Sequence, residues 1–429
     1  MSNKSILVST VGSWSDIGAD TWSTLLSKQD AKNISSLYLR ANINASPNCT
    51  HFYHIYENRL MKSILSPSIK TGEEYYSSDV PELLSNNGES TEEAQRYAKY
   101  KKKKSWLLMF AREFLWFFGR WNTKEFNQFL DKVNPDILIF PIESYIHLNR
   151  INKYIIKKKR PKVLSFFNDD NFSYKQEKSF GYIIHRWWQR RSVKWLVEHS
   201  DQVFAVSPKT KRECDEEFGI NSIIMSKPMT DDSVPEFKES KLPIRLVYTG
   251  KLYINREKTL ATVAAAVKKI NAAGTKVILD IYSGSPLSVE DRQALECDKD
   301  CHFCGEIPYS QVFEKQKEAD ILLFVEDLSD KNLVARLSLS TKVTDYFASG
   351  RCMWAIGNKD LGPIEYIKEQ DAGLVSMTEQ EVFDVLDYVV NNPSVIQEYA
   401  RNGYECGIKN HSVEKLTEIM DGFINGNEL

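Results

Sequence analysis

Three hydroxyl side chains precede a predicted helix in the C-terminal half of the chain. Ser338, Ser340 and Thr341 occur in the segment SLSTKVTDYFASG, and Lys342 follows them directly. Serine and threonine at the start of a helix cap its free N–H groups, and these groups together with the helix dipole attract anions. The pattern therefore predicts an anion site. The simpler alternative is a capped amphipathic helix without a ligand.

Three cysteines have a spacing that is typical of a metal or cluster site. Cys297, Cys301 and Cys304 form the pattern C-x3-C-x2-C, which matches the iron–sulfur signature of radical-SAM enzymes. That signature requires a surrounding barrel, which the rest of the sequence does not predict. A structural zinc that includes His302 is disfavoured because neighbouring residues of a strand point to opposite faces. We expect Cys304 to be a small buried residue, Cys297 and Cys301 to lie in a polar loop, and no metal site.

Alternating strands and helices must position these residues. In the N-terminal half, apolar runs without polar alternation predict strands of a parallel sheet covered on both faces, at SILVSTV, PDILIFP, KVLSFF and DQVFAVS. In the C-terminal half, similar runs separated by helices occur at IRLVYTG, KVILDIYSG, HFCG, ADILLFV and CMWAIG. Such alternation is typical of doubly wound parallel sheets. The expected fold class is α/β, with two Rossmann-like domains facing a central cleft.

A polar segment with several prolines, 226–243, has no hydrophobic period and is interpreted as a linker. We expect an N-terminal domain over 1–235 and a C-terminal domain over 243–412. The last stretch, 413–429, is expected to form a helix that could cross back to the first domain. A chain of 429 residues is long enough for two domains with separate cores.

Four segments of the C-terminal half resemble the donor-binding domain of GT-B glycosyltransferases of the GT4-like group, over nearly its whole length. LVYTGKLYINREKTLATVAAAVKKI resembles the family's strand, glycine, basic loop and helix, and LDIYSGSP resembles its next strand and glycine turn. HFCGEIPYSQVFEKQKEADILLFV resembles the F-x-G-x-(V/I)-P segment with the helix and strand that follow. SLSTKVTDYFASGRCMWAIG resembles the S-K-x-x-E-Y-x-A-x-G-x-P segment of members that assemble polysaccharides. The N-terminal half resembles the family's acceptor domain less closely.

The resemblance implies a site for the diphosphate of a nucleotide sugar, where cations stabilise the charge on the leaving group. Lys251 and Lys258 match the family's basic residues after the glycine, here Gly250, and at the helix start. Arg256 competes for the same role because this loop is longer than in the family. The alternative is a solvated basic loop.

The resemblance also assigns the rest of the donor site. The diphosphate would lie at the hydroxyl-rich helix start described above, and Asp345 takes the place of a family glutamate that bonds the ribose hydroxyls. The family's second glutamate, eight residues earlier, is replaced by Leu337, so the acid that recognises the sugar must come from elsewhere or be absent. The base would lie against Gly305, Glu306 and Ile307.

The N-terminal half offers weaker candidates. Gly12 and Gly18 lie between a strand and a helix, where glycine lets the backbone approach a ligand closely. After KVLSFF, where many relatives carry a histidine of the catalytic cleft, this chain has Asn168 and Asp169. We take these two as the candidate catalytic residues, although Asp169 and Asp170 could equally cap a helix.

The resemblance implies a retaining glycosyltransferase that transfers a sugar from a nucleoside diphosphate to a glycan or a lipid-linked glycan, in the assembly of a cell-surface polysaccharide or glycoconjugate. In this family the departing diphosphate is thought to assist, so no metal or other cofactor is expected. Two alternatives stay open. A GT-B-like nucleotide-sugar epimerase would give a small-molecule product, and a non-catalytic partner that binds nucleotide sugar or glycan would show no turnover of a donor.

Positive charge is concentrated in the first half of the chain. Residues 96–195 contain 23 lysines and arginines against 8 aspartates and glutamates, although the whole chain has a net charge of −2. Such asymmetry indicates a polyanionic partner, and nucleic acid is disfavoured because the second domain is acidic.

The segment 97–121, YAKYKKKKSWLLMFAREFLWFFGRW, places five lysines before an apolar helical stretch with tryptophans near both ends. Interfacial helices have this composition, so we expect a peripheral contact with the inner face of a membrane. The alternative is a buried core helix that follows a solvated lysine run.

The expected location is the cytoplasm. The apolar run at the start of the sequence is too short for a secretory signal, and no run approaches the roughly 20 residues that span a bilayer. The odd number of cysteines, seven, also favours a reducing compartment.

Overall fold

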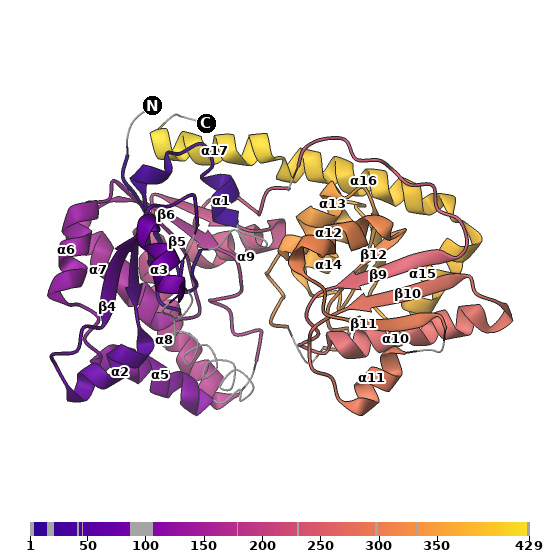
Figure 1. The fold of residues 1–429 in the computed structure, drawn as a ribbon, viewed down its shortest axis with the longest axis horizontal. Helices are drawn as coiled ribbons and strands as arrows, with labels where there is room; N and C mark the ends of the chain where they lie inside the picture. Colours follow the sequence, from indigo (N-terminus) through magenta and orange to yellow (C-terminus); the bar gives the residue numbers. More distant parts are fainter. Residues whose placement is uncertain are drawn as a thin grey trace. The chain divides into compact units, whose positions relative to one another are not determined.

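The computed structural model describes residues 4–14, 21–40, 43–44, 46–85, 106–177, 179–229, 231–296, 299–330 and 333–426. The chain divides into two compact units. Unit 1 comprises Met1–Met225 and Leu416–Leu429, and unit 2 comprises Ser226–Lys415. Each unit is an α/β structure built on one central sheet (Figure 1).

Unit 1 contains an eight-stranded sheet in the order β4-β3-β2-β1-β5-β6-β7-β8. Its neighbouring strands are parallel, except that β4 at the edge runs antiparallel to β3. Strands β1, β5 and β6 at the middle of the sheet are buried on both faces, which explains why their sequences are mainly apolar. The strands are β1 (Ile6–Ser9), β2 (Ile34–Tyr38), β3 (His51–Ile55), β4 (Gly72–Tyr76), β5 (Ile137–Pro141), β6 (Lys162–Phe167), β7 (Gln202–Ala205) and β8 (Ile223–Ile224).

The helices of unit 1 follow local signals in the sequence. Helix α9 begins after Ser207, whose Oγ accepts a hydrogen bond from the Thr210 N–H at 3.2 Å, and it ends at Gly219 in the left-handed region. The C-terminal helix α17, yellow in Figure 1, packs on unit 1, since Lys4 and Lys162 each donate to one of its carbonyls at 2.7 Å. The helices are α1 (Thr21–Leu25), α2 (Glu57–Leu65), α3 (Val80–Ser85), α5 (Trp106–Phe118), α6 (Lys124–Val133), α7 (Ile146–Lys159), α8 (Phe180–Glu198), α9 (Pro208–Phe218) and α17 (Val413–Asn425).

Unit 2 contains a six-stranded, fully parallel sheet in the order β11-β10-β9-β12-β13-β14. Strand β9 comes first in the chain but pairs with β10 on one side and β12 on the other. In such sheets ligands bind at the carboxyl ends of the strands where the order reverses, which here is the end of β9. The strands are β9 (Ile244–Thr249), β10 (Val277–Tyr282), β11 (Cys301–Gly305), β12 (Ile321–Val325), β13 (Cys352–Ile356) and β14 (Leu374–Ser376), and the helices are α10 (Arg256–Ile270), α11 (Val289–Leu295), α12 (Tyr309–Glu318), α13 (Thr341–Ala348), α14 (Gly362–Glu369), α15 (Glu379–Asn391) and α16 (Ser394–His411).

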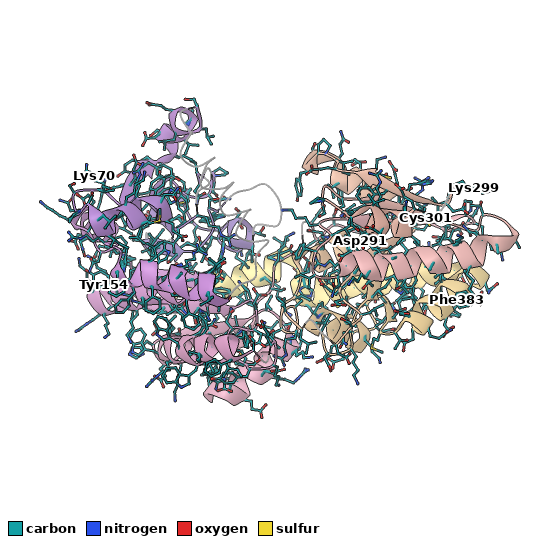
Figure 2. The ribbon with its side chains drawn as sticks, turned by 90° about the horizontal axis from the view of Figure 1, so that it is seen from below. Lys70, Tyr154, Asp291, Lys299, Cys301 and Phe383 are labelled. Atoms are coloured by element: carbon teal, nitrogen blue, oxygen red, sulfur yellow. The ribbon has the colours of Figure 1, made fainter. Side chains whose placement is uncertain are left out.

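The predictions for the cysteines are wrong in two respects. Cys301, labelled in Figure 2, is 2 % exposed at the start of β11 and disulfide-bonded, not in a polar loop. Cys304 is an exposed free thiol, because Cys301 and Phe303 pack against the core and the period of two turns Cys304 outward. Cys297 lies outside the described residues, and among those described no group of three or more metal-binding side chains occurs.

The segment interpreted as a linker begins inside unit 2. Ser226, Lys227 and Met229 are buried, and the Met229 N–H donates to the His411 carbonyl at 2.8 Å. The polar composition of the segment therefore did not reveal that its first residues are buried in this unit.

A candidate donor site in the second unit

The turn after β9 is shaped by Gly250. Its φ of +144° is a conformation that other residues rarely adopt, and its N–H donates to the Tyr282 carbonyl at 3.0 Å. A Cβ at this position would lie 2.0 Å from Lys342 Nζ. The missing side chain therefore leaves the space in which the ammonium group of Lys342 lies.

Lys342 reaches this turn from the first turn of α13. Ser340 caps the helix, with its Oγ accepting from the Lys342 N–H at 3.4 Å. At the other end of the side chain, Nζ donates to the Thr249 carbonyl at 2.6 Å and lies 5.0 Å from the centre of the Tyr248 ring. Desolvation, reinforced by the charge of Arg256, lowers the pKa of Lys342 to about 8. The site thus holds a cation whose charge is lost just above neutral pH.

Arg256 is the first residue of α10 and forms an ion pair with Glu326, which directly follows β12. Two bonds join them, Nε to Oε2 at 3.1 Å and Nη2 to Oε1 at 2.5 Å. The side chain of Glu326 is only 3 % exposed. Although burial opposes it, the Glu326 carboxylate raises the pKa of Arg256 above its ordinary value, so the guanidinium stays charged. Sequence reasoning identified Arg256 but missed its partner.

The two predicted lysines of this loop are more peripheral. Lys251 adjoins Gly250 with an exposed side chain, and its carbonyl accepts from the Tyr248 hydroxyl at 2.9 Å. Lys258 is exposed on the first turn of α10. The structure therefore brings Gly250, Arg256 and Lys342 together, and leaves Lys258 on the helix surface.

The start of α13 holds the other predicted residues of this site. Ser338 and Thr341 flank the cap and are half-buried. Asp345, one turn further, forms an ion pair with Lys227, with 2.5 Å between Oδ1 and Nζ. Lys227 was not identified from the sequence, because it lies in the segment that looked like a linker. Leu337, in the place of the family acid, is fully buried.

The predicted contacts of the base lie two strands away from β9. Gly305 ends β11 with a φ of +76°, and its carbonyl accepts from the Ser283 N–H at 2.8 Å. Ile307 follows and is half-buried. Because β11, β10 and β9 run parallel, these residues lie at the same carboxyl edge of the sheet as Arg256 and Lys342.

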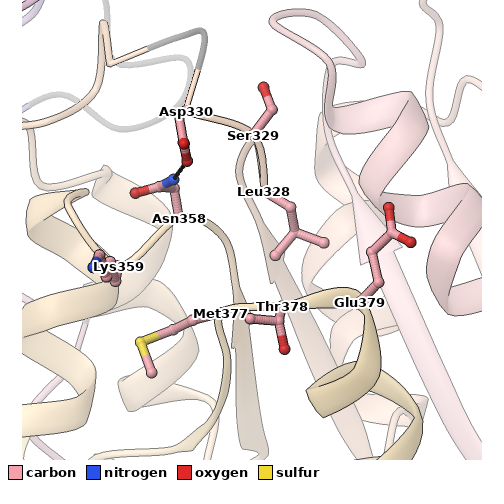
Figure 3. Close-up of a pocket in the computed structure, with 8 residues that line it drawn as sticks. All are labelled: Leu328, Ser329, Asp330, Asn358, Lys359, Met377, Thr378 and Glu379. Atoms are coloured by element: carbon pink, nitrogen blue, oxygen red, sulfur yellow. Dashed lines mark hydrogen bonds between the residues drawn. The ribbon is translucent and has the colours of Figure 1, made fainter.

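A pocket lies further along the same edge, on the other side of β12 (Figure 3). Asn358 and Asp330 bond across it at 3.0 Å between Nδ2 and Oδ1. None of the predicted donor-site residues lines it, so it is separate from the cluster of Arg256 and Lys342. Its lining residues are Leu328, Ser329, Asp330, Asn358, Lys359, Met377, Thr378 and Glu379.

Unit 1 also gathers candidate residues at the carboxyl edge of its sheet. Gly12 follows β1, and Asn168 and Asp169, both exposed, follow β6. Between these strands lies β5, which is followed by Glu143. Desolvation and the nearby Asp169 carboxylate raise the pKa of Glu143 to about 7, against the opposing charge of Arg40. Glu143 was not identified from the sequence, because the groups that shift its pKa, Asp169 and Arg40, are distant from it in the chain.

Replacing Glu143 by glutamine is expected to stabilise the protein at pH 8 but not at pH 4. The folded-state pKa of about 7 lies above the ordinary value of 4.5, so the wild type loses stability as the pH rises from 4.5 to 7. Glutamine removes this loss of stability, which is on the order of 3 kcal/mol. Unfolding in urea at both pH values measures the difference. The matched control is Glu82→Gln, at an exposed position of the same unit. Equal effects of Glu143→Gln at the two pH values would show that the carboxyl is not perturbed.

No protein-family model matches the sequence, and no curated protein matches it. Several solved structures, however, are similar to this chain. Sucrose-phosphate synthase from Thermosynechococcus elongatus is 12 % identical with a TM-score of 0.59, over 98 % of each chain. HepE from Anabaena, in complex with UDP and glucose, is 9 % identical with a TM-score of 0.60, over 98 % of this chain and 99 % of that one. The lipopolysaccharide outer core galactosyltransferase WaaB is 14 % identical with a TM-score of 0.58, over 99 % of both chains.

The similarity to these structures extends over almost the whole of every chain compared. It agrees with the two α/β units and their parallel sheets. The chain has the GT-B fold of these glycosyltransferases.

Proposed function

We propose that the protein is a retaining glycosyltransferase of the GT4-like group. It would transfer a sugar from a nucleoside diphosphate to a glycan or lipid-linked glycan during assembly of a cell-surface polysaccharide or glycoconjugate. The observation that carries the proposal is the pair of cations, Lys342 and Arg256, at the end of β9, where the strand order of the sheet reverses. The diphosphate would lie at the N-terminus of α13, where free N–H groups and the helix dipole favour anions.

In this reaction an acceptor hydroxyl oxygen bonds to the anomeric carbon of the donor while the bond from that carbon to the diphosphate oxygen breaks. The electron pair leaves with the diphosphate, whose charge the two cations stabilise. The departing diphosphate takes the hydroxyl proton on the same face of the sugar, so the step requires no metal or other cofactor. In unit 1, Asn168 and Asp169 are the proposed catalytic residues, with Glu143 beside Asp169.

Uracil is the base that we propose to test first, because HepE is described in complex with UDP and with UDP-glucose. The proposed contact is the backbone at Gly305 and Ile307. Melting temperatures of the full chain with UDP, GDP, ADP and their monophosphates test this, since a ligand of the native state raises the melting temperature. We expect one diphosphate to give the largest shift, and the corresponding sugar nucleotide to be consumed.

A non-catalytic nucleotide-sugar or glycan-binding protein is the second candidate. Three observations favour it: Arg256 and Asp345 are already paired with protein groups, and a fully buried leucine stands where the family has an acid. Turnover of a radiolabelled donor with a panel of glycan acceptors separates the candidates, because a binding protein would retain the donor unchanged.

Helix α5 supports the proposal of a membrane contact. Its residues Glu113 and Trp116 are buried in unit 1, where the Glu113 carboxylate lies 3.0 Å from His147 Nδ1. Phe114, Phe117 and other large apolar residues of the same helix are exposed. Among the described residues, the helix thus packs on the unit through Glu113 and Trp116 and leaves large apolar side chains exposed. The lysine tract that precedes it, within 99–104, lies outside the described residues.

Neighbouring helices extend the exposed apolar face. Helix α5 packs against α2 and α8, and α2 and α5 lie near each other in Figure 1. On α8 the exposed Arg191 lies 4.7 Å from the ring of Trp187, a pairing of cation and aromatic ring suited to an anionic interface. Among the described helices none is long and apolar enough to cross a bilayer. The contact that we propose is peripheral, with the cytoplasmic leaflet. The exposed apolar residues of the three helices are Met61, Ile64, Leu65, Leu107, Leu108, Phe114, Phe117, Phe118, Phe180, Ile183, Ile184 and Trp187.

Replacing Phe114 and Phe117 together by serine is expected to weaken binding to anionic vesicles at least tenfold. The change removes two aromatic rings that would otherwise leave water, each worth roughly 1.5–3 kcal/mol when fully buried.

Changing the four lysines 101–104 to glutamine should also weaken vesicle binding, since each lysine contributes about 1 kcal/mol near an anionic surface. High salt should have the same effect. Sedimentation with anionic and neutral liposomes measures both. Tyr388→Ser, at an exposed position of unit 2, is the control, and unchanged binding of both variants would contradict the contact.

A further inference from the structure

Glu326 is a buried acid of the donor site that has no role in the reaction described above. Its main-chain N–H donates to the Ile356 carbonyl at 2.8 Å, which fixes the residue at the end of β12. Its carboxylate engages Arg256 through both oxygens while remaining almost inaccessible to solvent. The pair therefore occupies the edge of the sheet where the diphosphate is proposed to bind.

The positive charges around this pair are partly offset by two carboxylates. The charge of Arg256 lowers the pKa of Lys342, whereas the charge of Glu326 raises it. Asp345, paired with Lys227, also favours the charged form of Lys342, and the Thr249 carbonyl and the Tyr248 ring are its other neighbours. Glu326 thus supplies the negative charge that two desolvated cations require.

We propose that Glu326 is an exchangeable counter-ion of Arg256. This inference rests on the proposed function. In the empty site its carboxylate holds both bonds of the guanidinium, and a bound diphosphate takes over at least one of them. Glu326 then competes with the diphosphate for Arg256 and weakens its binding. The competition helps the site to release the nucleoside diphosphate after transfer, when a site of two unopposed cations would retain it.

The decisive variant is Glu326→Gln, with UDP as the titrant and inorganic pyrophosphate as a probe that needs no base. Glutamine keeps the shape and one acceptor oxygen, so it still orients Arg256, but it no longer competes as an anion. We expect UDP and pyrophosphate to bind about tenfold tighter at pH 6.5, where Lys342 is protonated. Glu326→Asp, whose shorter carboxylate cannot keep both bonds, should also bind UDP more tightly. Glu326→Asp therefore tests the proposal if Glu326→Gln does not fold.

A double-mutant cycle with Arg256→Gln distinguishes exchange from a general change of charge. Once the guanidinium is gone, Glu326 holds no bond that the diphosphate must take over, so Glu326→Gln should then add little affinity. The pH profile is a second readout. Loss of the Glu326 charge lowers the pKa of Lys342, so the fall of UDP affinity with rising pH should move to lower pH in Glu326→Gln.

The matched control is Glu57→Gln, which breaks a similar pair in unit 1, with 2.7 Å between Glu57 Oε2 and Arg112 Nη2. It should leave both the affinity for UDP and the pH profile unchanged. If neither variant of Glu326 binds more tightly, or if Glu326→Gln gives the same gain with and without Arg256, the exchange is wrong. If the wild type binds neither UDP nor any other nucleoside diphosphate, the proposed function itself fails.

Discussion

Replacing Lys342 by alanine is expected to weaken UDP binding by about tenfold or more and to abolish sugar transfer. The ammonium group is desolvated against the Thr249 carbonyl, so it exchanges little solvation for a contact with phosphate. A charge-assisted bond of this kind is worth on the order of 1.5–3 kcal/mol. Calorimetric titration at pH 7 measures the loss.

Two controls make this result specific. Lys368→Ala, at an exposed position near the end of α14, removes the same charge from unit 2 and should bind UDP like the wild type. Lys258→Ala should weaken binding less than Lys342→Ala, because the Lys258 side chain is exposed to water. An affinity of Lys342→Ala equal to that of the wild type would remove Lys342 from the site.

The second large effect is expected at Gly250. Alanine there would place its Cβ 2.0 Å from Lys342 Nζ, so the ammonium group must leave the Thr249 carbonyl. We expect UDP affinity to fall about as far as in Lys342→Ala, and the stability to fall by roughly 1–3 kcal/mol because of the positive φ. Titration calorimetry and urea unfolding measure the two effects.

Gly274→Ala separates the backbone strain from the displacement of the lysine. Gly274 has a φ of +133°, close to that of Gly250, but a Cβ there would meet no atom within 4 Å. This variant should lose similar stability and keep its UDP affinity. Equal losses of affinity in the two variants would mean that strain, and not the position of Lys342, is responsible.

The sequence predicted the strands whose burial on both faces leaves an unbroken apolar run. Strands β1, β5, β6 and β7 of unit 1, and β9, β10, β12 and β13 of unit 2, all occur where such runs were found. The half-exposed edge strand β11 occurs at the expected segment HFCG. It did not indicate β2, with sequence ISSLY, or the edge strand β4, with sequence GEEYY. Polar residues within these strands are accommodated by partners from distant segments, which no local pattern reveals. Ser35 Oγ, for example, lies 3.3 Å from His51 Nδ1 on β3.

In the donor site too, residues with a local sequence pattern were predicted, and residues whose partners are distant in the chain were missed. Gly250, Lys342 and the Ser340 cap were identified because the turn and the helix start have local sequence patterns. Glu326 and Lys227 were missed because their roles come from partners 70 and 118 residues away in the chain. Glu143 was missed for the same reason.

A crystal structure of the full chain with the nucleoside diphosphate that most raises its melting temperature tests the central claim most directly. The account predicts both phosphates at the N-terminus of α13, within hydrogen-bond distance of Lys342 Nζ, with the base against Gly305 and Ile307. A nucleotide bound instead in the pocket lined by Leu328 and Glu379, or in unit 1, would contradict it.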